Sequence, residues 1–312
     1  MNWTVENIPD LSGKIIVVTG GNSGLGFESV KAFASKGAEV VLASRSMEKG
    51  EVAREEILKT VPSGKILVMQ LDLGDLDSIK NFVSAFKHNY KKLNVLLNNA
   101  GIMTTPYFTT KDGFEGQLGT NHLGHFALTG LLVDLLLKTE GARIVNVSSG
   151  AHKRGEMDFH NLMFENGQDY SPMKAYGRSK LSNLLFTYEL QRKLEAAKRD
   201  TIATAAHPGI AMTNLARHLE GKFLFKIMSP LFKMMAQDQA MGALPQIRAS
   251  VDPEVKGSEY YGPDGKREFK GYPVVVPSNE ASHNTGDAAK LWEESEKLTG
   301  VKIEIPAIRP SQ

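Results

Sequence analysis

Short runs of β-branched and aliphatic residues alternate with longer stretches of helical period over the first two-thirds of the chain. This alternation is typical of βαβ units, in which parallel strands are buried on both faces and helices make the crossovers. The pattern predicts strands at residues 15–18, 40–43, 66–71, 95–97, 144–147 and 202–206. It predicts helices at residues 24–36, 47–60, 76–90, 113–138, 176–197 and 286–299. We therefore expect an α/β fold with a doubly wound, mostly parallel sheet and helices on both faces.

The alternation of strand-like and helical stretches becomes less regular after Pro208. Residues 210–236 are rich in Met, Phe and Leu with scattered Lys, and residues 251–285 are rich in Gly, Pro and Tyr. A length of 312 residues allows one domain or two, but no linker, repeat or low-complexity tract divides the chain. We predict a single domain over residues 1–312, with an apolar substrate lid at 210–236 and an irregular region at 251–285.

Composition excludes several classes of function. The 37 basic and 35 acidic residues nearly cancel, and no run of like charge is present, which argues against nucleic acid as a partner. Because the chain has no cysteine, thiolate catalysis, disulfides and Cys-ligated metals are excluded. The sequence shows neither a signal peptide nor a transmembrane segment, so we expect a soluble, cytoplasmic protein. Peripheral membrane contact through the lysines of 210–236, and the oligomeric state, stay open.

A glycine-rich segment follows the first predicted strand and precedes the first predicted helix. It reads Thr19-Gly20-Gly21-Asn22-Ser23-Gly24-Leu25-Gly26. Glycines let the backbone approach a pyrophosphate, and the N-terminus of a helix offers it free N–H groups and a positive dipole. The alternative is a glycine-rich turn without a ligand, but the strand and helix on either side favour a dinucleotide site.

The end of the second predicted strand indicates which dinucleotide is bound. NAD sites usually carry Asp or Glu there to bond the ribose 2′-hydroxyl, whereas this chain has Ser44 and Arg45. The Arg45 guanidinium can bind a 2′-phosphate through charge-assisted hydrogen bonds, and the Ser44 hydroxyl can add another. The sequence therefore favours NADP(H) over NAD(H). The alternative is that Arg45 is a solvated surface residue that opens the next helix.

The spacing Tyr-x-x-x-Lys puts a phenol and an ammonium group on one helical face. It occurs three times, at Tyr107/Lys111, Tyr170/Lys174 and Tyr176/Lys180. The first two pairs lie beside or across a proline, so neither sits securely inside a helix. The third pair opens a long helix, because apolar positions recur at helical spacing after it. We take Tyr176 and Lys180 as the candidate chemical pair.

A phenol has an unperturbed pKa of about 10, so it needs a nearby cation to act as an acid or base near neutrality. Lys180 can supply that cation. A hydroxyl that holds a substrate carbonyl can come from Ser148 or Ser149, which end the fifth predicted strand, where open α/β sheets bind ligands. Alternation along the strand does not decide which serine faces the ligand, and a role as helix or turn cap is the alternative for both.

Together these residues resemble the short-chain dehydrogenase/reductase family, whose members have a Rossmann fold. The resemblance rests on Thr19-Gly20-x-x-x-Gly24-x-Gly26, Asn98-Asn99-Ala100-Gly101, Ser148-Ser149, Tyr176-x-x-x-Lys180 and Pro208-Gly209. The segments at residues 121–126, 176–183 and 207–209 are most similar to the branch that contains retinol dehydrogenases and the WW-domain oxidoreductase.

The resemblance implies roles for individual residues. Tyr176 matches the proton donor or acceptor, Lys180 the residue that lowers its pKa, Ser149 the carbonyl-orienting hydroxyl and Asn121 the holder of a relay water. Asp72 matches an adenine contact, Asn99 a neighbour of the adenine ribose and Thr213 a carboxamide contact. Cofactor contacts are expected from Gly20, Asn22, Ser23, Gly24, Leu25, Gly26, Ser44, Arg45, Asp72, Leu73, Asn99, Ala100, Gly101, Tyr176, Lys180, Pro208, Gly209 and Thr213.

The implied activity is the NADP(H)-dependent interconversion of a carbonyl and an alcohol on a lipophilic small molecule. The alternatives are a Rossmann protein that senses NADP(H) without turnover and a methyltransferase of the same fold. We expect no metal, since His122 and His125 lie three residues apart without a convincing third ligand, and a packed or hydrogen-bonded pair fits them better. His207 is expected to serve the backbone turn before Pro208, and His152 is a weak candidate for substrate contact.

Overall fold

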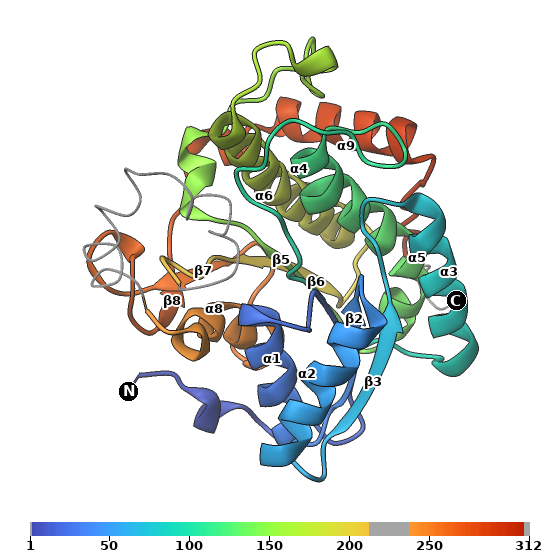
Figure 1. The fold of residues 1–312 in the computed structure, drawn as a ribbon, viewed down its shortest axis with the longest axis vertical. Helices are drawn as coiled ribbons and strands as arrows, with labels where there is room; N and C mark the ends of the chain where they lie inside the picture. Colours follow the sequence, from blue (N-terminus) through green and yellow to red (C-terminus); the bar gives the residue numbers. More distant parts are fainter. Residues whose placement is uncertain (1, 212–236, 309–312) are drawn as a thin grey trace.

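The computed structural model describes residues 2–211 and 237–308 and shows one sheet between two layers of helices (Figure 1). The strands are β1 (Ile15–Thr19), β2 (Glu39–Ser44), β3 (Lys65–Gln70), β4 (Val95–Asn98), β5 (Arg143–Val147), β6 (Ile202–Ala206), β7 (Tyr260–Pro263) and β8 (Pro273–Val275). Their order in the sheet is β3-β2-β1-β4-β5-β6-β7-β8. Every neighbouring pair is parallel except β7 and β8. The expected α/β fold with a doubly wound, mostly parallel sheet is confirmed.

Helices make the crossovers between the parallel strands. The α-helices are α1 (Gly24–Ser35), α2 (Met47–Thr60), α3 (Leu76–Asn89), α4 (Gly116–Leu118), α5 (Gly124–Lys138), α6 (Pro172–Ala196), α8 (Gln239–Val251) and α9 (Thr285–Thr299). The π-helical turn η2 (Gly119–Leu123) joins α4 to α5. Short 3-10 turns are η1 (Val5–Asn7), η3 (Gly150–Arg154), η4 (Glu165–Gly167), η6 (Lys266–Glu268) and η7 (Glu280–His283).

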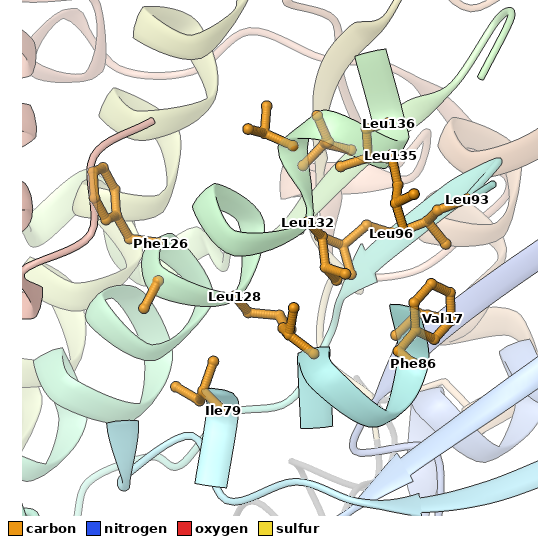
Figure 2. Packing of buried hydrophobic residues seen from close by; sticks show 14 of the residues in the cluster. Val17, Ile79, Phe86, Leu93, Leu96, Phe126, Leu128, Leu132, Leu135 and Leu136 are labelled. Carbon is orange, nitrogen blue, oxygen red and sulfur yellow. The ribbon is translucent and has the colours of Figure 1, made fainter. Parts of the chain in front are cut away.

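Each face of the sheet has its own hydrophobic core. Because side chains alternate along a strand, Val17 of β1 packs with one layer and its neighbours Ile16 and Val18 pack with the other. Helices α3, α5, α6 and α9 cover the first face, where Phe86 and Leu132 meet the strands (Figure 2). Helices α1, α2 and α8 cover the second face. Both faces of the central strands are therefore buried, as the apolar runs predict.

Residues 237–285 are more regular than their sequence predicts. Residues 251–285 contain β7 and β8, which extend the sheet from six strands to eight, and α8 precedes them. The alternation of apolar and polar residues does not predict these two strands, because they are short and include Gly and Pro. Strand β8 is an edge strand, where Pro is tolerated. Helix α8 has Pro245 in its interior and is stabilised by packing against α1, so propensity alone misses it.

The order of the strands fixes where a ligand can bind. The chain runs outward from β1 to β3 on one side and from β4 onward on the other, so a crevice opens at the carboxyl ends of β1 and β4. The turns after β1, β4 and β5 carry the candidate residues to this edge. Among the described residues, no helix is both long enough and apolar enough to cross a bilayer.

Candidate active site

The turn between β1 and α1 leaves backbone N–H groups free for an anion. Gly20 and Gly24 have positive φ angles of 66° and 59°, a region that side chains disfavour. Ser23 is the N-cap residue of α1, and its side chain makes no capping hydrogen bond. Asn22 and Leu25 are half-buried in the same turn. An uncapped first helical turn with a positive dipole fits the pyrophosphate of a dinucleotide.

Residues from three segments brace this turn. The backbone N–H groups of Asn99 and Ala100 donate to Oγ1 of Thr19, each at 2.9 Å. Asn99 Nδ2 donates to the carbonyl oxygen of Thr19 at 2.8 Å, and its Oδ1 accepts from Gln246 Nε2 at 2.9 Å. A Cβ added to Gly26 would clash with the carbonyl oxygen of the first glycine of the turn. The side chain of Asn99 thus holds the turn in place, and its contact with the adenine ribose stays a prediction.

A cavity of about 700 Å³ lies at the ends of β2 and β3, beside α3. Arg45 and Asp72 both line it, so the structure brings together the residues predicted for the adenosine end of a cofactor. Arg45 is exposed, and no hydrogen bond or ion pair to it occurs within residues 2–211 and 237–308. The Ser44 hydroxyl donates to the carbonyl oxygen of Ser46 at 2.9 Å, and its contact with a 2′-phosphate stays a prediction. Leu73 is buried next to Asp72.

Ser149, Tyr176 and Lys180 meet at the carboxyl end of β5. Tyr176 and Lys180 lie one turn apart near the start of α6, with Lys180 Nζ 5.8 Å from the centre of the Tyr176 ring. Burial raises the pKa of Tyr176 to about 12, although a hydrogen bond with the Ser149 side chain lowers it. Ser148 Oγ donates to the carbonyl oxygen of Lys180 at 2.8 Å. The structure therefore distinguishes the two serines: Ser149 contacts the tyrosine, and Ser148 anchors the strand to α6.

Lys180 is buried without a carboxylate partner among the described residues. Its Nζ donates to the carbonyl oxygen of Val147 at 2.9 Å, and burial lowers its pKa to about 8. A lysine with this pKa is charged below about pH 8. The ammonium group therefore remains available to stabilise a Tyr176 phenolate.

Asn121 lies in η2, a π-helical turn of a kind often found at functional sites. Its side chain is buried and fully bonded. Oδ1 accepts from the N–H of Ile102 at 2.8 Å, and Nδ2 donates to the carbonyl oxygen of Ile102 and to Ser179 Oγ, each at 2.9 Å. A Cβ on the neighbouring Gly101 would lie 3.5 Å from Lys180 Nζ. Asn121 thus fixes the chain that passes beside Lys180.

The other two Tyr-x-x-x-Lys pairs have structural contacts. Lys111 Nζ bonds Asp75 at 2.9 Å, and Lys174 Nζ lies 5.8 Å from the centre of the Phe164 ring. The two tyrosines pack edge to face, with ring centres 5.3 Å apart, and the Tyr170 hydroxyl donates to the carbonyl oxygen of Thr105 at 2.8 Å. These two tyrosines join the loop after β4 to the segment before α6.

The turn after β6 is held from the C-terminal region. Gly209 has a φ angle of 65°, and a Cβ there would clash with the carbonyl oxygen of Phe269. The Gly209 N–H donates to His207 Nδ1 at 3.2 Å, as expected for a histidine that serves this turn, and Gln237 Nε2 bonds the carbonyl oxygen of Pro208 at 2.8 Å. Thr213 and residues 212–236 of the predicted lid lie outside the described residues.

The other three histidines considered from the sequence, His122, His125 and His152, have separate partners. His122 Nε2 bonds Ser295 Oγ at 2.9 Å, whereas His125 Nε2 bonds Thr19 Oγ1 at 2.9 Å. The two imidazoles therefore have different hydrogen-bond partners. Burial lowers the pKa of His152 to about 4, and its Nδ1 donates to the carbonyl oxygen of Ser149 at 2.6 Å. His152 therefore supports the Ser149 backbone from inside the protein. In the described ranges, no group of three or more potential ligands could hold a metal ion.

Arg178 was not expected from the sequence, yet it is the largest fully buried side chain described. From α6 it reaches the insertion at residues 155–171, where Nε donates to the carbonyl oxygen of Glu156 at 3.1 Å. Nη1 donates to those of Asn161 and Leu162 at 2.7 and 2.9 Å. Its guanidinium carbon lies 4.0 Å from the centre of the Phe164 ring. Arg178 therefore fastens the insertion to the helix that carries Tyr176.

Replacing Arg178 by methionine should destabilise the protein by about 3 kcal/mol, because three carbonyl groups, at least partly buried, lose their charged donor. Chymotrypsin should cut within 155–171 faster than in the wild type. Arg192→Met on the same helix is the control, since its partly exposed pair with Glu189 lies within one turn of the helix and contributes about 1 kcal/mol or less. Equal losses of unfolding free energy for the two variants in urea titrations would refute the role given to Arg178.

The chain is similar to known proteins over most of its length. A family model described as short chain dehydrogenase matches residues 14–222. Retinol dehydrogenase 11 from Homo sapiens is 40% identical over 294 residues, which cover 94% of this chain and 88% of that protein. Retinol dehydrogenase 12 from Homo sapiens is 41% identical over 295 residues and covers 94% of this chain and 89% of its own.

Among solved structures, an uncharacterized protein from Mycobacterium paratuberculosis has a TM-score of 0.81 at 38% identity. The match covers 97% of this chain and all of that one. Sequence and fold thus agree over nearly the whole molecule, from the glycine-rich turn to the C-terminal strands. We conclude that the chain belongs to the short-chain dehydrogenase family.

Proposed function

We propose that this protein is an NADP(H)-dependent oxidoreductase that interconverts a carbonyl and an alcohol on a lipophilic small molecule. Membership of the short-chain dehydrogenase family makes it a nicotinamide-dependent oxidoreductase. The choice of cofactor, the substrate class and the roles of individual residues form our proposal.

One observation supports the chemistry above all others. Ser149, Tyr176 and a buried Lys180 come together at the carboxyl edge of the sheet, on the same edge as the uncapped glycine-rich turn. A protein that only sensed NADP(H) would need the turn but not the phenol, the ammonium and the hydroxyl. A methyltransferase would need neither the Tyr–Lys pair nor the Pro208-Gly209 turn.

The bound nicotinamide would supply or accept the hydride. For reduction, the Ser149 hydroxyl would hold the carbonyl oxygen of the substrate and the Tyr176 hydroxyl would donate a proton to it. The resulting phenolate would be stabilised by the Lys180 ammonium group, which burial places close to it without a competing carboxylate in the described part of the chain. For oxidation the same groups would act in the reverse direction.

The substrate class is supported by the relatives and by composition. Two relatives are named as dehydrogenases of retinol, a lipophilic alcohol, and residues 210–236 are rich in Met, Phe and Leu, as adaptable apolar sites are. Assays with NADPH and a panel of aliphatic and aromatic aldehydes test whether the protein turns over a carbonyl substrate and whether it prefers lipophilic ones. Binding of NADPH without turnover of any aldehyde or alcohol would favour a sensor. A cytoplasmic location also remains our prediction, supported by the lack of cysteine and testable by fractionation.

The preference for NADP(H) can be tested at Arg45. Replacing Arg45 by aspartate should raise the Kd of NADPH by about 10- to 100-fold, because an attraction for the 2′-phosphate becomes a repulsion. The Kd of NADH should change less than about threefold. Fluorescence titration measures both constants directly, so that a defect in turnover cannot be mistaken for one in binding.

Lys59→Asp is the matched control for Arg45→Asp. It makes the same change of charge near the far end of α2, about 18 Å along the helix axis from its start. We expect it to leave both cofactor constants within about threefold of the wild type. If Arg45→Asp weakened NADPH and NADH equally, the assignment of Arg45 to the 2′-phosphate would be wrong.

A further inference from the structure

His125 lies between the glycine-rich turn after β1 and the π-helical turn η2, and it contacts both. It lies in the first turn of α5 and is 2% exposed. One ring nitrogen, Nε2, is 2.9 Å from Thr19 Oγ1 at the end of β1, and the other, Nδ1, is 3.0 Å from the carbonyl oxygen of Asn121 in η2. A single imidazole thus touches both the base of the glycine-rich turn and the turn that lies beside Lys180.

The partners of His125 determine where its proton lies. The carbonyl oxygen of Asn121 can only accept, so Nδ1 must carry the hydrogen. Oγ1 of Thr19 already accepts from the N–H groups of Asn99 and Ala100, each at 2.9 Å, which leaves its own hydrogen to donate. That hydrogen goes to Nε2, since the alternative acceptor, the carbonyl oxygen of Leu97, is farther away at 3.4 Å. With the hydrogen on Nδ1, both nitrogens of the neutral His125 ring have a hydrogen-bond partner.

The charge state agrees with this tautomer. The pKa of His125 is lowered to about 4, chiefly by burial; the hydrogen bond with Asn121 opposes this shift, and the Lys180 charge adds to it. The imidazole therefore stays neutral at physiological pH, and Nε2 stays an acceptor.

The two ring nitrogens of His125 contact different parts of the candidate site, Thr19 before the glycine-rich turn and Asn121 in η2. Thr19 Oγ1 fixes Asn99, which in turn holds the glycine-rich turn. In η2, the Gly124 N–H bonds the carbonyl oxygen of Gly119 five residues earlier, so the backbone leaves the α-helical register around Asn121. The His125 Nδ1–H supplies a donor to Asn121 where that register breaks.

We propose that His125 is a positioning residue that fixes the cofactor turn through Nε2 and the backbone beside Lys180 through Nδ1. This inference rests on the proposed function and deepens it. The effect on the cofactor turn depends on Nε2, and the effect on the backbone beside Lys180 depends on Nδ1. Substituting an amide side chain whose polar atoms take the place of only one of these nitrogens can therefore separate the two effects.

Asparagine at position 125 keeps a donor near the place of Nδ1 and leaves Thr19 without its acceptor. We expect His125→Asn to raise the Kd of NADPH by about 10-fold or more and to change the single-turnover hydride-transfer rate at saturating NADPH less than threefold. Glutamine places its amide near the position of Nε2 and leaves the Asn121 carbonyl without a donor. We expect His125→Gln to keep the Kd within about threefold and to lower the hydride-transfer rate by about 10-fold or more.

His122→Asn and His122→Gln are the matched controls, because His122 is equally buried but bonds Ser295 of α9. Far-UV circular dichroism and thermal melting show whether all four variants fold. A general packing role would weaken binding and rate together in both His125 variants and would be matched by the controls. That parallel loss, or no effect of either substitution at position 125, would overturn the proposal.

A spectroscopic measurement tests the same idea without turnover. In wild-type protein labelled with ¹⁵N-histidine, the His125 resonances should report a neutral ring with the hydrogen on Nδ1, unchanged from about pH 5.5 to 8.5. A hydrogen on Nε2, or titration within this range, would contradict the proposal. If no substrate is turned over by the wild type, the proposed function fails, while the tautomer and the NADPH constants still decide the role of His125.

Discussion

Replacing Tyr176 by phenylalanine is expected to lower kcat by about 10²- to 10⁴-fold, the range that general acid–base groups contribute. The substitution removes only the oxygen that would move the proton and keeps the ring, which is 5% exposed. The Kd of NADPH should therefore stay within about threefold. Steady-state rates with the best aldehyde, together with fluorescence titration of the cofactor, measure the two effects separately.

The other two tyrosines of the Tyr-x-x-x-Lys spacing are controls for this prediction. Tyr170→Phe removes the hydrogen bonds of its hydroxyl with the carbonyl oxygen of Thr105 and with Gln117 Nε2, so it should reduce the free energy of unfolding by about 1–2 kcal/mol and leave kcat nearly unchanged. Tyr107→Phe should also leave kcat nearly unchanged, because the ring contact with Tyr170 is retained. An inactive Tyr107 or Tyr170 variant beside an active Tyr176→Phe enzyme would show that we chose the wrong pair.

Much of the fold could be predicted because the signal is local. The first six strands are runs rich in β-branched and aliphatic residues, and their observed bounds differ from the predicted ones by one residue at most. All but the edge strand β3 are almost wholly buried. Helix α8 and strands β7 and β8 have no such signal. They exist because they pack against a sheet that is already formed, as Leu244 and Ile247 do in the core shared with α1. Tertiary contacts outweigh the Pro and Gly of their sequence.

The candidate site was predictable where it lies on continuous motifs. Glycine spacing and the Tyr–Lys pair each lie within one segment, so the sequence indicates them directly. Contacts between distant segments leave no such pattern, as the bond between Thr19 and His125 shows, since it spans 106 positions. The roles of Ser148 and Ser149 likewise needed the structure, because only the position of α6 decides which hydroxyl bonds the helix.

The second large effect is expected at Gly26, in the first turn of α1. An alanine there would bring its Cβ against the carbonyl oxygen of Gly20 and to 2.6 Å from Asn99 Nδ2. The Gly20 contact is with backbone, so it cannot be relieved by a change of side-chain rotamer. Either the turn or α1 must move, and the N–H groups predicted to bind the pyrophosphate would move with it. We expect Gly26→Ala to raise the Kd of NADPH by about 100-fold or more.

A control for Gly26→Ala must introduce the same methyl group without disturbing backbone. Gly286, near the start of α9, meets this need, because the nearest atom to its Cβ would be Asn284 Oδ1 at 3.3 Å, which belongs to a side chain and not to backbone. Gly286→Ala should leave cofactor binding unchanged. Thermal melting separates a shifted turn from a general loss of folding, since a folded Gly26→Ala protein should lose the stabilisation that NADPH gives the wild type. If folded Gly26→Ala bound NADPH as tightly as the wild type, the glycine-rich turn would not be the pyrophosphate site.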